Sequence, residues 1–119
     1  MLNLSHKKLI AWQRAIEFLP VLYQLAEKLP NEERYNLVSQ MKRAGLSVSN
    51  NLAEGSSRKS KLEKNRFFEI ACSSLVEIDN CIEASLILKF LSKNDINNAE
   101  TKLEEMFKLI SGLIASNNK

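Results

Sequence analysis

Apolar and polar positions follow a helical spacing through the middle of the chain, between residues 37 and 55. Apolar residues recur there every three or four positions, which is typical of the buried face of an α-helix; they are Leu37, Met41, Ala44, Val48 and Leu52. A polar row with the same period runs beside them, formed by Gln40, Arg43, Ser47, Asn51 and Glu54. Polar residues so close to a core face either meet solvent or hold a specific arrangement. We therefore predict a helix with a core stripe and a neighbouring polar seam.

Helical spacing continues in both directions and predicts four helices. They cover approximately residues 5–27, 32–56, 61–91 and 93–116. Asn31 is expected to cap the second helix, and Gly55-Ser56-Ser57 is expected to end it, with Gly55 as a helix stop. Ser60 and Ser92 have the spacing of N-caps for the third and fourth helices. Pro20 lies inside the first helix and predicts a kink there, because proline cannot donate a backbone hydrogen bond.

No segment alternates as a β-strand does, and three glycines and two prolines are too few for the turns of a sandwich. Four amphipathic helices with short loops predict an all-α, antiparallel up-and-down four-helix bundle as a single domain over residues 1–119. The core face expected for the first helix is Leu9, Trp12, Ile16, Leu19, Tyr23 and Ala26. In the third helix, a second apolar row consists of Phe68, Leu75 and Leu86. That row indicates either self-association or a central helix packed on two sides.

Composition narrows the class of protein further. No apolar run approaches the ~18 residues of a membrane span, and the N-terminus lacks the pattern of a signal peptide, so we predict a cytoplasmic protein without membrane contact. Cys72 and Cys81 are nine residues apart, on nearly opposite sides of one helix, so we expect reduced, buried thiols. With a single histidine, His6, no metal site or cofactor is predicted.

The net charge of +3 is unevenly distributed. Residues 42 to 66 contain seven basic and two acidic residues, and the basic ones are Lys42, Arg43, Arg58, Lys59, Lys61, Lys64 and Arg66. Such a cluster suits phosphate oxygens and predicts binding of RNA or DNA. The alternative is an ordinary solvated basic face. No aromatic residue alternates with these cations, so we expect no sequence-specific base recognition.

Groups that could form an active site are scarce. Glu54 and Glu77 could meet in one polar seam with Arg43 or Asn51 if their helices are antiparallel neighbours. A general acid/base pair is one interpretation of that pair. We favour a structural network that fixes helix register, because no nucleophile or metal accompanies the two carboxylates. The predicted seam comprises Gln40, Ser47, Asn51, Glu54 and Glu77, and no catalytic residue is predicted.

The segment from Gln40 to Gly55 resembles the Gln-x-x-Arg-Ala-x-x-Ser-x-x-x-Asn-Ile-Ala-Glu-Gly motif of bacterial four-helix-bundle proteins encoded in intervening sequences of 23S rRNA genes. The resemblance extends to Trp12, to the Leu-Pro-x-Glu-Glu-x-Tyr-x-Leu run at 29–37, to Arg58, and to residues 71–77. It therefore covers nearly the whole chain.

The resemblance implies a left-handed bundle that assembles as a homopentamer with a central channel. Related accessory proteins of diversity-generating retroelements are thought to bind nucleic acid and a reverse transcriptase, and some family members carry a ribosomal-protein label because of their gene's location. No catalytic residue is carried over. Our leading hypothesis is a non-enzymatic oligomer that binds nucleic acid through its basic surface. The alternative is a protein-interaction scaffold or accessory factor without direct nucleic-acid binding.

Overall fold

The computed structural model describes residues 1–118, which form four α-helices and two short 3₁₀ turns. The helices are α1 (Ile10–Glu27), α2 (Leu37–Ser57), α3 (Lys61–Ile87) and α4 (Lys93–Asn117). The turns are η1 (Ser5–Lys8) and η2 (Asn31–Glu33). Lys119, which the predicted domain includes, lies outside the described residues.

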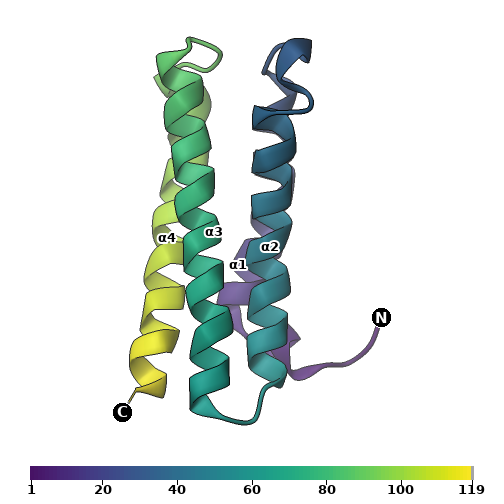
Figure 1. The fold of residues 1–119 in the computed structure, drawn as a ribbon, viewed down its shortest axis with the longest axis vertical. Coiled ribbons are helices and arrows are strands. Elements are labelled where there is room, and N and C mark those ends of the chain that lie inside the picture. Colours follow the sequence, from purple (N-terminus) through teal and green to yellow (C-terminus); the bar gives the residue numbers. More distant parts are fainter. Residues whose placement is uncertain (119) are drawn as a thin grey trace.

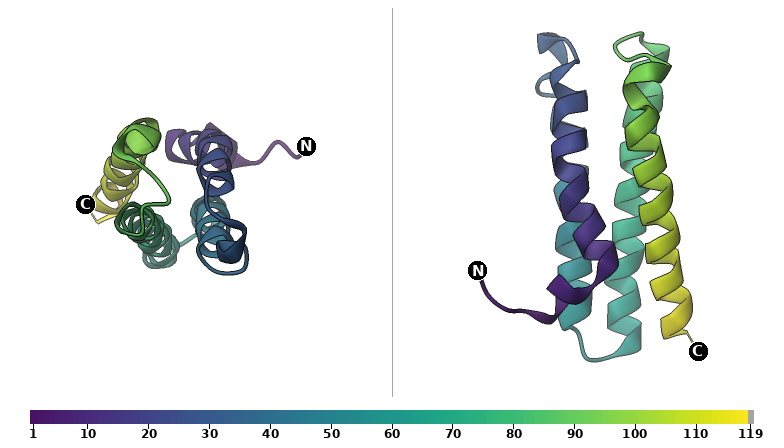
Figure 2. Two further views of the ribbon diagram at one scale, coloured as in Figure 1. Left: turned by 90° about the horizontal axis from the view of Figure 1, so that it is seen from above. Right: turned by 180° about the vertical axis from the view of Figure 1, so that it is seen from behind.

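The helices run alternately up and down, and each contacts its two neighbours around a square (Figures 1 and 2). α1 contacts α2 and α4, and α3 contacts the same two helices. The all-α four-helix bundle predicted from the sequence is thereby confirmed. Both ends of the described chain lie at the end of the bundle where α2 turns into α3 (Figure 1).

The starts of the first two helices differ from the prediction. Residues 5–8 form η1 and not α-helix, because Leu9 adopts an extended conformation between η1 and α1. Asn31 does not cap α2, because it begins η2, and α2 starts six residues later at Leu37. The side chain of Asn36 connects η2 to α2, because its amide donates to Glu33 and its carbonyl oxygen accepts from Gln40 (3.0 Å each).

The predicted end of the third helix, at residue 91, is also wrong. α3 ends at Ile87, and Lys89 adopts a left-handed conformation with φ of 65°. The N–H of Phe90 donates to the carbonyl of Ser85 (2.9 Å), and the N–H of Lys89 donates to that of Leu86 (3.0 Å). This Schellman motif ends the helix without the usual glycine.

The predicted caps of α3 and α4 are confirmed. The Ser60 hydroxyl accepts a hydrogen bond from the N–H of Glu63 (3.1 Å). Ser92 and Asp95 form a reciprocal capping box at the start of α4. These side chains satisfy N–H groups that the first turn of a helix otherwise leaves without partners.

The core face of α1 is rotated from the predicted one. Its buried residues are Ala11, Ala15, Phe18, Leu22, Leu25 and Ala26. Of the predicted face only Ala26 is buried, and Ile16 is exposed. Two alanines turn inward because their small side chains let the neighbouring helices approach. The kink expected at Pro20 stays a prediction.

Two glycines of α2 lie where side chains of neighbouring helices leave no room for a Cβ atom. A Cβ atom added to Gly45 would lie 2.6 Å from Cδ2 of Leu22 in α1. A Cβ atom added to Gly55 would lie 2.6 Å from Cε1 of Phe68 in α3. The second helix ends within the predicted Gly55-Ser56-Ser57 segment, but the prediction that Gly55 itself acts as the helix stop is wrong. Gly55 is a buried helical residue that makes room for an aromatic ring, and α2 continues to Ser57.

The second apolar row of α3 is buried within the subunit. Phe68 and Leu75 belong to the core, and Leu86 is half-buried against it. Of the two interpretations left open by the sequence, the structure favours a central helix packed on two sides.

Candidate functional site

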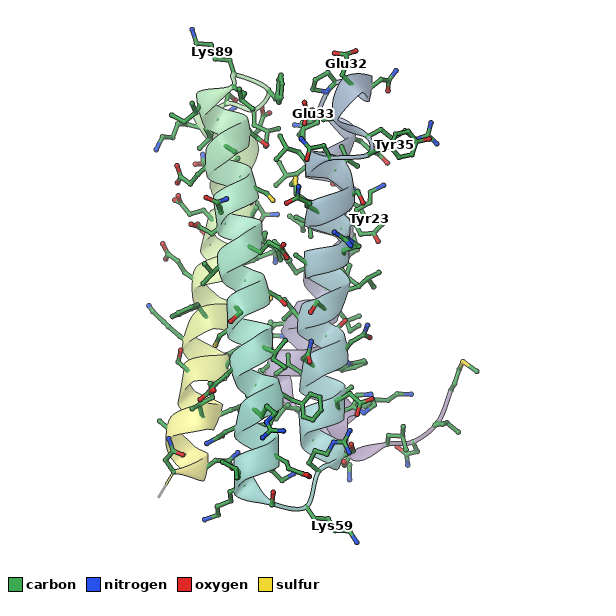
Figure 3. All side chains as sticks on the ribbon, viewed as in Figure 1. Tyr23, Glu32, Glu33, Tyr35, Lys59 and Lys89 are labelled. Carbon is green, nitrogen blue, oxygen red and sulfur yellow. The ribbon has the colours of Figure 1, made fainter. Side chains whose placement is uncertain are left out.

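The loop between α2 and α3 and the first turns of α3 form a cluster of basic residues. Lys59 extends away from this loop (Figure 3), and Lys61 and Arg66 are also exposed. Neither Lys59 nor Arg66 has an ion pair or hydrogen bond to its side chain within residues 1–118. Their charges are therefore available to a ligand.

Two other basic residues of this cluster have structural contacts. Arg58 pairs with Glu54 (2.9 Å), and its guanidinium lies 4.8 Å from the ring centre of Phe67. The Lys64 ammonium donates to the carbonyls of Ser56 (3.1 Å) and Gly55 (3.5 Å) at the C-terminal end of α2. A lysine there satisfies terminal carbonyls and complements the negative end of the helix dipole.

Lys42 and Arg43 do not join this cluster. They lie on α2 about 15 residues before Arg58, the residue that follows the end of this helix, which separates them from it by roughly 22 Å at 1.5 Å per residue. The Lys42 ammonium lies 4.8 Å from the ring centre of Tyr23, which places it between α2 and α1. Proximity in the sequence therefore overstated the size of the basic cluster.

The fold adds two lysines that the sequence analysis did not include. η1 packs against α2 near the α2–α3 loop, and it carries Lys7 and Lys8 (Figures 1 and 2). The Lys7 ammonium donates to the carbonyl of Leu2, and Lys8 is exposed. We call Lys7, Lys8, Arg58, Lys59, Lys61, Lys64 and Arg66 the basic end. No sequence signal connects η1 to residues 58–66, because only tertiary packing brings them together.

Part of the predicted polar seam joins α2 to α3. The hydroxyl of Ser74 on α3 donates to the hydroxyl of Ser47 on α2 (2.8 Å). The side-chain amide of Asn51 donates to the same hydroxyl (3.0 Å) and to the Ser47 carbonyl (2.8 Å). Ser74 is buried and Ser47 is half-buried, so this small network connects two helices at a fixed register.

The remaining seam residues lie elsewhere. Gln40 donates to Asn36, and Glu54 pairs with Arg58 on the solvent side of α2. Glu77 is exposed on α3, and no hydrogen bond joins it to Glu54, Arg43 or Asn51. The two carboxylates therefore do not share a site in the described residues.

The thiols and acidic residues of the described chain form no evident reactive centre. Cys81 is buried and Cys72 is half-buried, both are free, and burial raises the pKa of each thiol. No group of three or more His, Cys, Asp or Glu residues within residues 1–118 could hold a metal ion. None of the described helices is both long and apolar enough to span a bilayer.

Fold and surface together define a small four-helix bundle with a basic end and a close-packed seam between α2 and α3. A family model described as 23S rRNA-intervening sequence protein matches residues 7–112, and the chain belongs to that family. The resemblance seen in the sequence is thereby confirmed. A comparison with curated proteins found no match.

Proposed function

We propose that this protein is a non-enzymatic factor that binds RNA or DNA through its basic end. The observation that carries the proposal is the gathering of η1 and the start of α3 at one end of the bundle. This brings Lys8, Lys59 and Arg66 to the same end with exposed charges. Cations of this kind neutralise phosphates and release counterions, which favours binding to any nucleic-acid backbone.

Assembly into a homo-oligomer, with a pentamer as the expected state, would repeat the basic end in each copy. Linked sites of moderate affinity bind a long polyanion more tightly than one site does, because later contacts are intramolecular. Light scattering tests the assembly directly. A mass near five copies of the 13.5 kDa chain supports the pentamer, and a concentration-independent monomer contradicts it.

Nucleic-acid binding is tested by fluorescence anisotropy with a labelled RNA hairpin and a DNA duplex across a salt series. The Lys59→Glu/Arg66→Glu variant should weaken binding at least about tenfold at low salt and flatten the salt dependence by about two counterions. Both residues are exposed, so the fold should persist. Lys64 is left intact because it binds the carbonyls at the end of α2.

The matched control is Lys93→Glu/Arg34→Glu, which makes the same charge change at the opposite end of the bundle. It should reduce affinity much less than the basic-end variant. Undetectable binding of both nucleic acids at low salt, or equal losses in the two variants, would contradict the proposal.

A further inference from the structure

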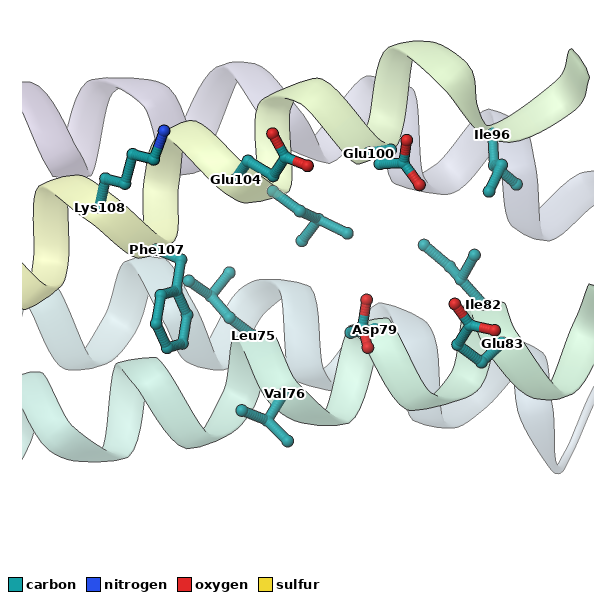
Figure 4. Close-up of a pocket in the computed structure, with 11 residues that line it drawn as sticks. Leu75, Val76, Asp79, Ile82, Glu83, Ile96, Glu100, Glu104, Phe107 and Lys108 are labelled. Atoms are coloured by element: carbon teal, nitrogen blue, oxygen red, sulfur yellow. The ribbon is translucent and has the colours of Figure 1, made fainter. Parts of the chain in front are cut away.

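A groove of about 380 Å³ runs between α3 and α4 (Figure 4). Its apolar lining consists of Leu75, Val76, Ile82, Ile96, Leu103 and Phe107. Leu75, Ile82 and Ile96 belong to the bundle core, whereas Val76 is 58% exposed and Phe107 is 46% exposed. The apolar surface that the groove offers to solvent therefore comes from Val76 and Phe107, with the half-buried Leu103, and no part of the described chain covers it.

Carboxylates line both sides of this apolar surface. Asp79 and Glu83 come from α3, and Glu100 and Glu104 come from α4 (Figure 4). Lys108 is the single basic residue of the lining. Within residues 1–118, none of the four carboxylates forms an ion pair or a side-chain hydrogen bond. This surface is complementary to a ligand that is apolar on one face and basic at its borders.

We propose that the α3–α4 groove binds a basic amphipathic helix of another polypeptide. Apolar side chains of that helix would cover Val76 and Phe107, and its lysine and arginine residues would pair with the carboxylates on either side. Helix-in-groove recognition uses this combination of apolar anchors and flanking charges.

The dimensions of the groove favour a helix of about three turns. Its lining on α4 extends from Ile96 to Lys108, which is about 18 Å at 1.5 Å per residue. A third helix can lie between two neighbouring helices as helices do within bundles. An extended peptide would find few backbone partners, because the amides of α3 and α4 are already bonded within their helices.

The charge of the groove separates this occupant from other classes of ligand. Nucleic acid would meet four carboxylates and one ammonium, so its phosphates would be repelled. A metal ion is disfavoured because no acidic cluster among residues 1–118 is arranged to hold one. Several cationic side chains spaced along a helix can reach carboxylates spaced along the groove.

The test uses a fluorescein-labelled 14-residue peptide of leucine and lysine, with leucines spaced to form one helical stripe. Fluorescence anisotropy should show saturable binding that weakens as salt increases. Glu100→Lys/Glu104→Lys should weaken binding by about tenfold or more. Phe107→Ser should also weaken it, through loss of the apolar anchor.

Matched variants control for general electrostatics and for surface hydrophobicity. Glu32→Lys/Glu77→Lys makes the same change in net charge outside the groove and should alter the dissociation constant by less than about twofold. Ile87→Ser removes an exposed apolar residue outside the groove and should have a similarly small effect. The Lys59→Glu/Arg66→Glu variant should still bind the peptide. The peptide test is therefore independent of whether the basic end binds nucleic acid.

Several outcomes would overturn the proposal. One is equal binding of a peptide with the same composition but no leucine stripe, and another is equal binding of the glutamate version. Unchanged affinity in Glu100→Lys/Glu104→Lys would place the site elsewhere. If the wild type does not bind the peptide, and the groove variants dissociate an oligomer in light scattering, the occupant is a second copy of this chain.

Discussion

The two sides of α3 are built differently. Toward α2, Gly55 lies under the ring of Phe68, and Ser74 donates a hydrogen bond to Ser47, so the helices are in close contact. Toward α4, branched apolar residues and carboxylates leave an open groove of about 380 Å³. Small residues let helix backbones approach, whereas bulky and charged residues hold part of the interface open to solvent.

The close-packed side contains the motif at residues 40–55, whereas the two surfaces proposed to bind ligands lie outside that motif. Residues 40–55 contain the longest motif of a resemblance that covers nearly the whole chain, and their glycines and Ser47 serve helix contacts. The basic end lies beyond that segment, and the acidic groove lies on the other side of α3. The most specific part of the sequence is therefore informative about packing between helices and less so about binding.

Gly55→Ala tests the close side of α3 and should have the largest effect on stability. The new Cβ would lie 2.6 Å from Cε1 of Phe68 and 3.2 Å from Cβ of Phe67. Overpacking against a buried ring costs about 1–3 kcal/mol, partly offset by the gain of roughly 1 kcal/mol in helix propensity. Urea unfolding should show a net loss of up to about 2 kcal/mol. An unchanged midpoint would mean that α2 and α3 separate at little cost.

Ser47→Ala and Ser74→Ala test the hydrogen bond across the same contact. Each substitution should cost about 1 kcal/mol, because the partner hydroxyl loses a hydrogen bond. In a double-mutant cycle the pair should be coupled by about 0.5–1 kcal/mol. The control cycle pairs Ser74 with Ser49, whose hydroxyl donates to the Leu46 carbonyl of its own helix (3.0 Å). Equal coupling energies in both cycles would contradict a specific hydrogen bond between Ser74 and Ser47.

Local signals predicted much of the bundle. Ser60 and Ser92 have the residue types and spacing of caps, and both helices begin where those signals indicate. The buried residues of α4 also match its 3.6-residue period, with Ile96, Met106 and Ile110 in the core. These features depend on residues close in the sequence, so the sequence alone suffices to predict them.

Features that depend on tertiary contacts were predicted poorly. The bulky stripe of α1 suggested a face including Ile16, but neighbouring helices select the smaller Ala11 and Ala15. Lys89 gave no sign of a helix end, because nothing in its residue type requires a positive φ.

The candidate sites show the same limit. Lys7 and Lys8 lie near the α2–α3 loop only because η1 packs against α2. The acidic groove combines carboxylates from α3 and α4, which no motif in the sequence pairs. Both surfaces therefore depend on how the helices pack against one another, which no local pattern in the sequence predicts.

Gly112→Ala provides the opposite case to Gly55→Ala. Gly112 is an exposed helical residue of α4, and an added Cβ would meet no atom within 4 Å. Alanine restricts the unfolded chain and favours the helix, so stability should rise by about 0.5–1 kcal/mol. Thermal or urea unfolding measures the change. A loss of stability would show that another surface, such as a second copy of the chain, contacts this position.

Asp95→Asn contrasts a paired carboxylate at the start of α4 with the unpaired ones of the groove. The hydrogen bond from Lys28 (2.9 Å), together with bonds from Ser92, lowers the pKa of Asp95 from 3.8 to about 2. Because the pKa is lower in the folded state, the stabilisation is fully present above about pH 4 and is lost as the pH falls toward 2. Urea unfolding of the wild type should show this loss, and Asp95→Asn should remove it. Lys28→Met should reduce this loss without removing it, because the capping bonds from Ser92 remain. If both variants keep the wild-type dependence of the unfolding free energy on pH, other carboxylates cause the acid sensitivity.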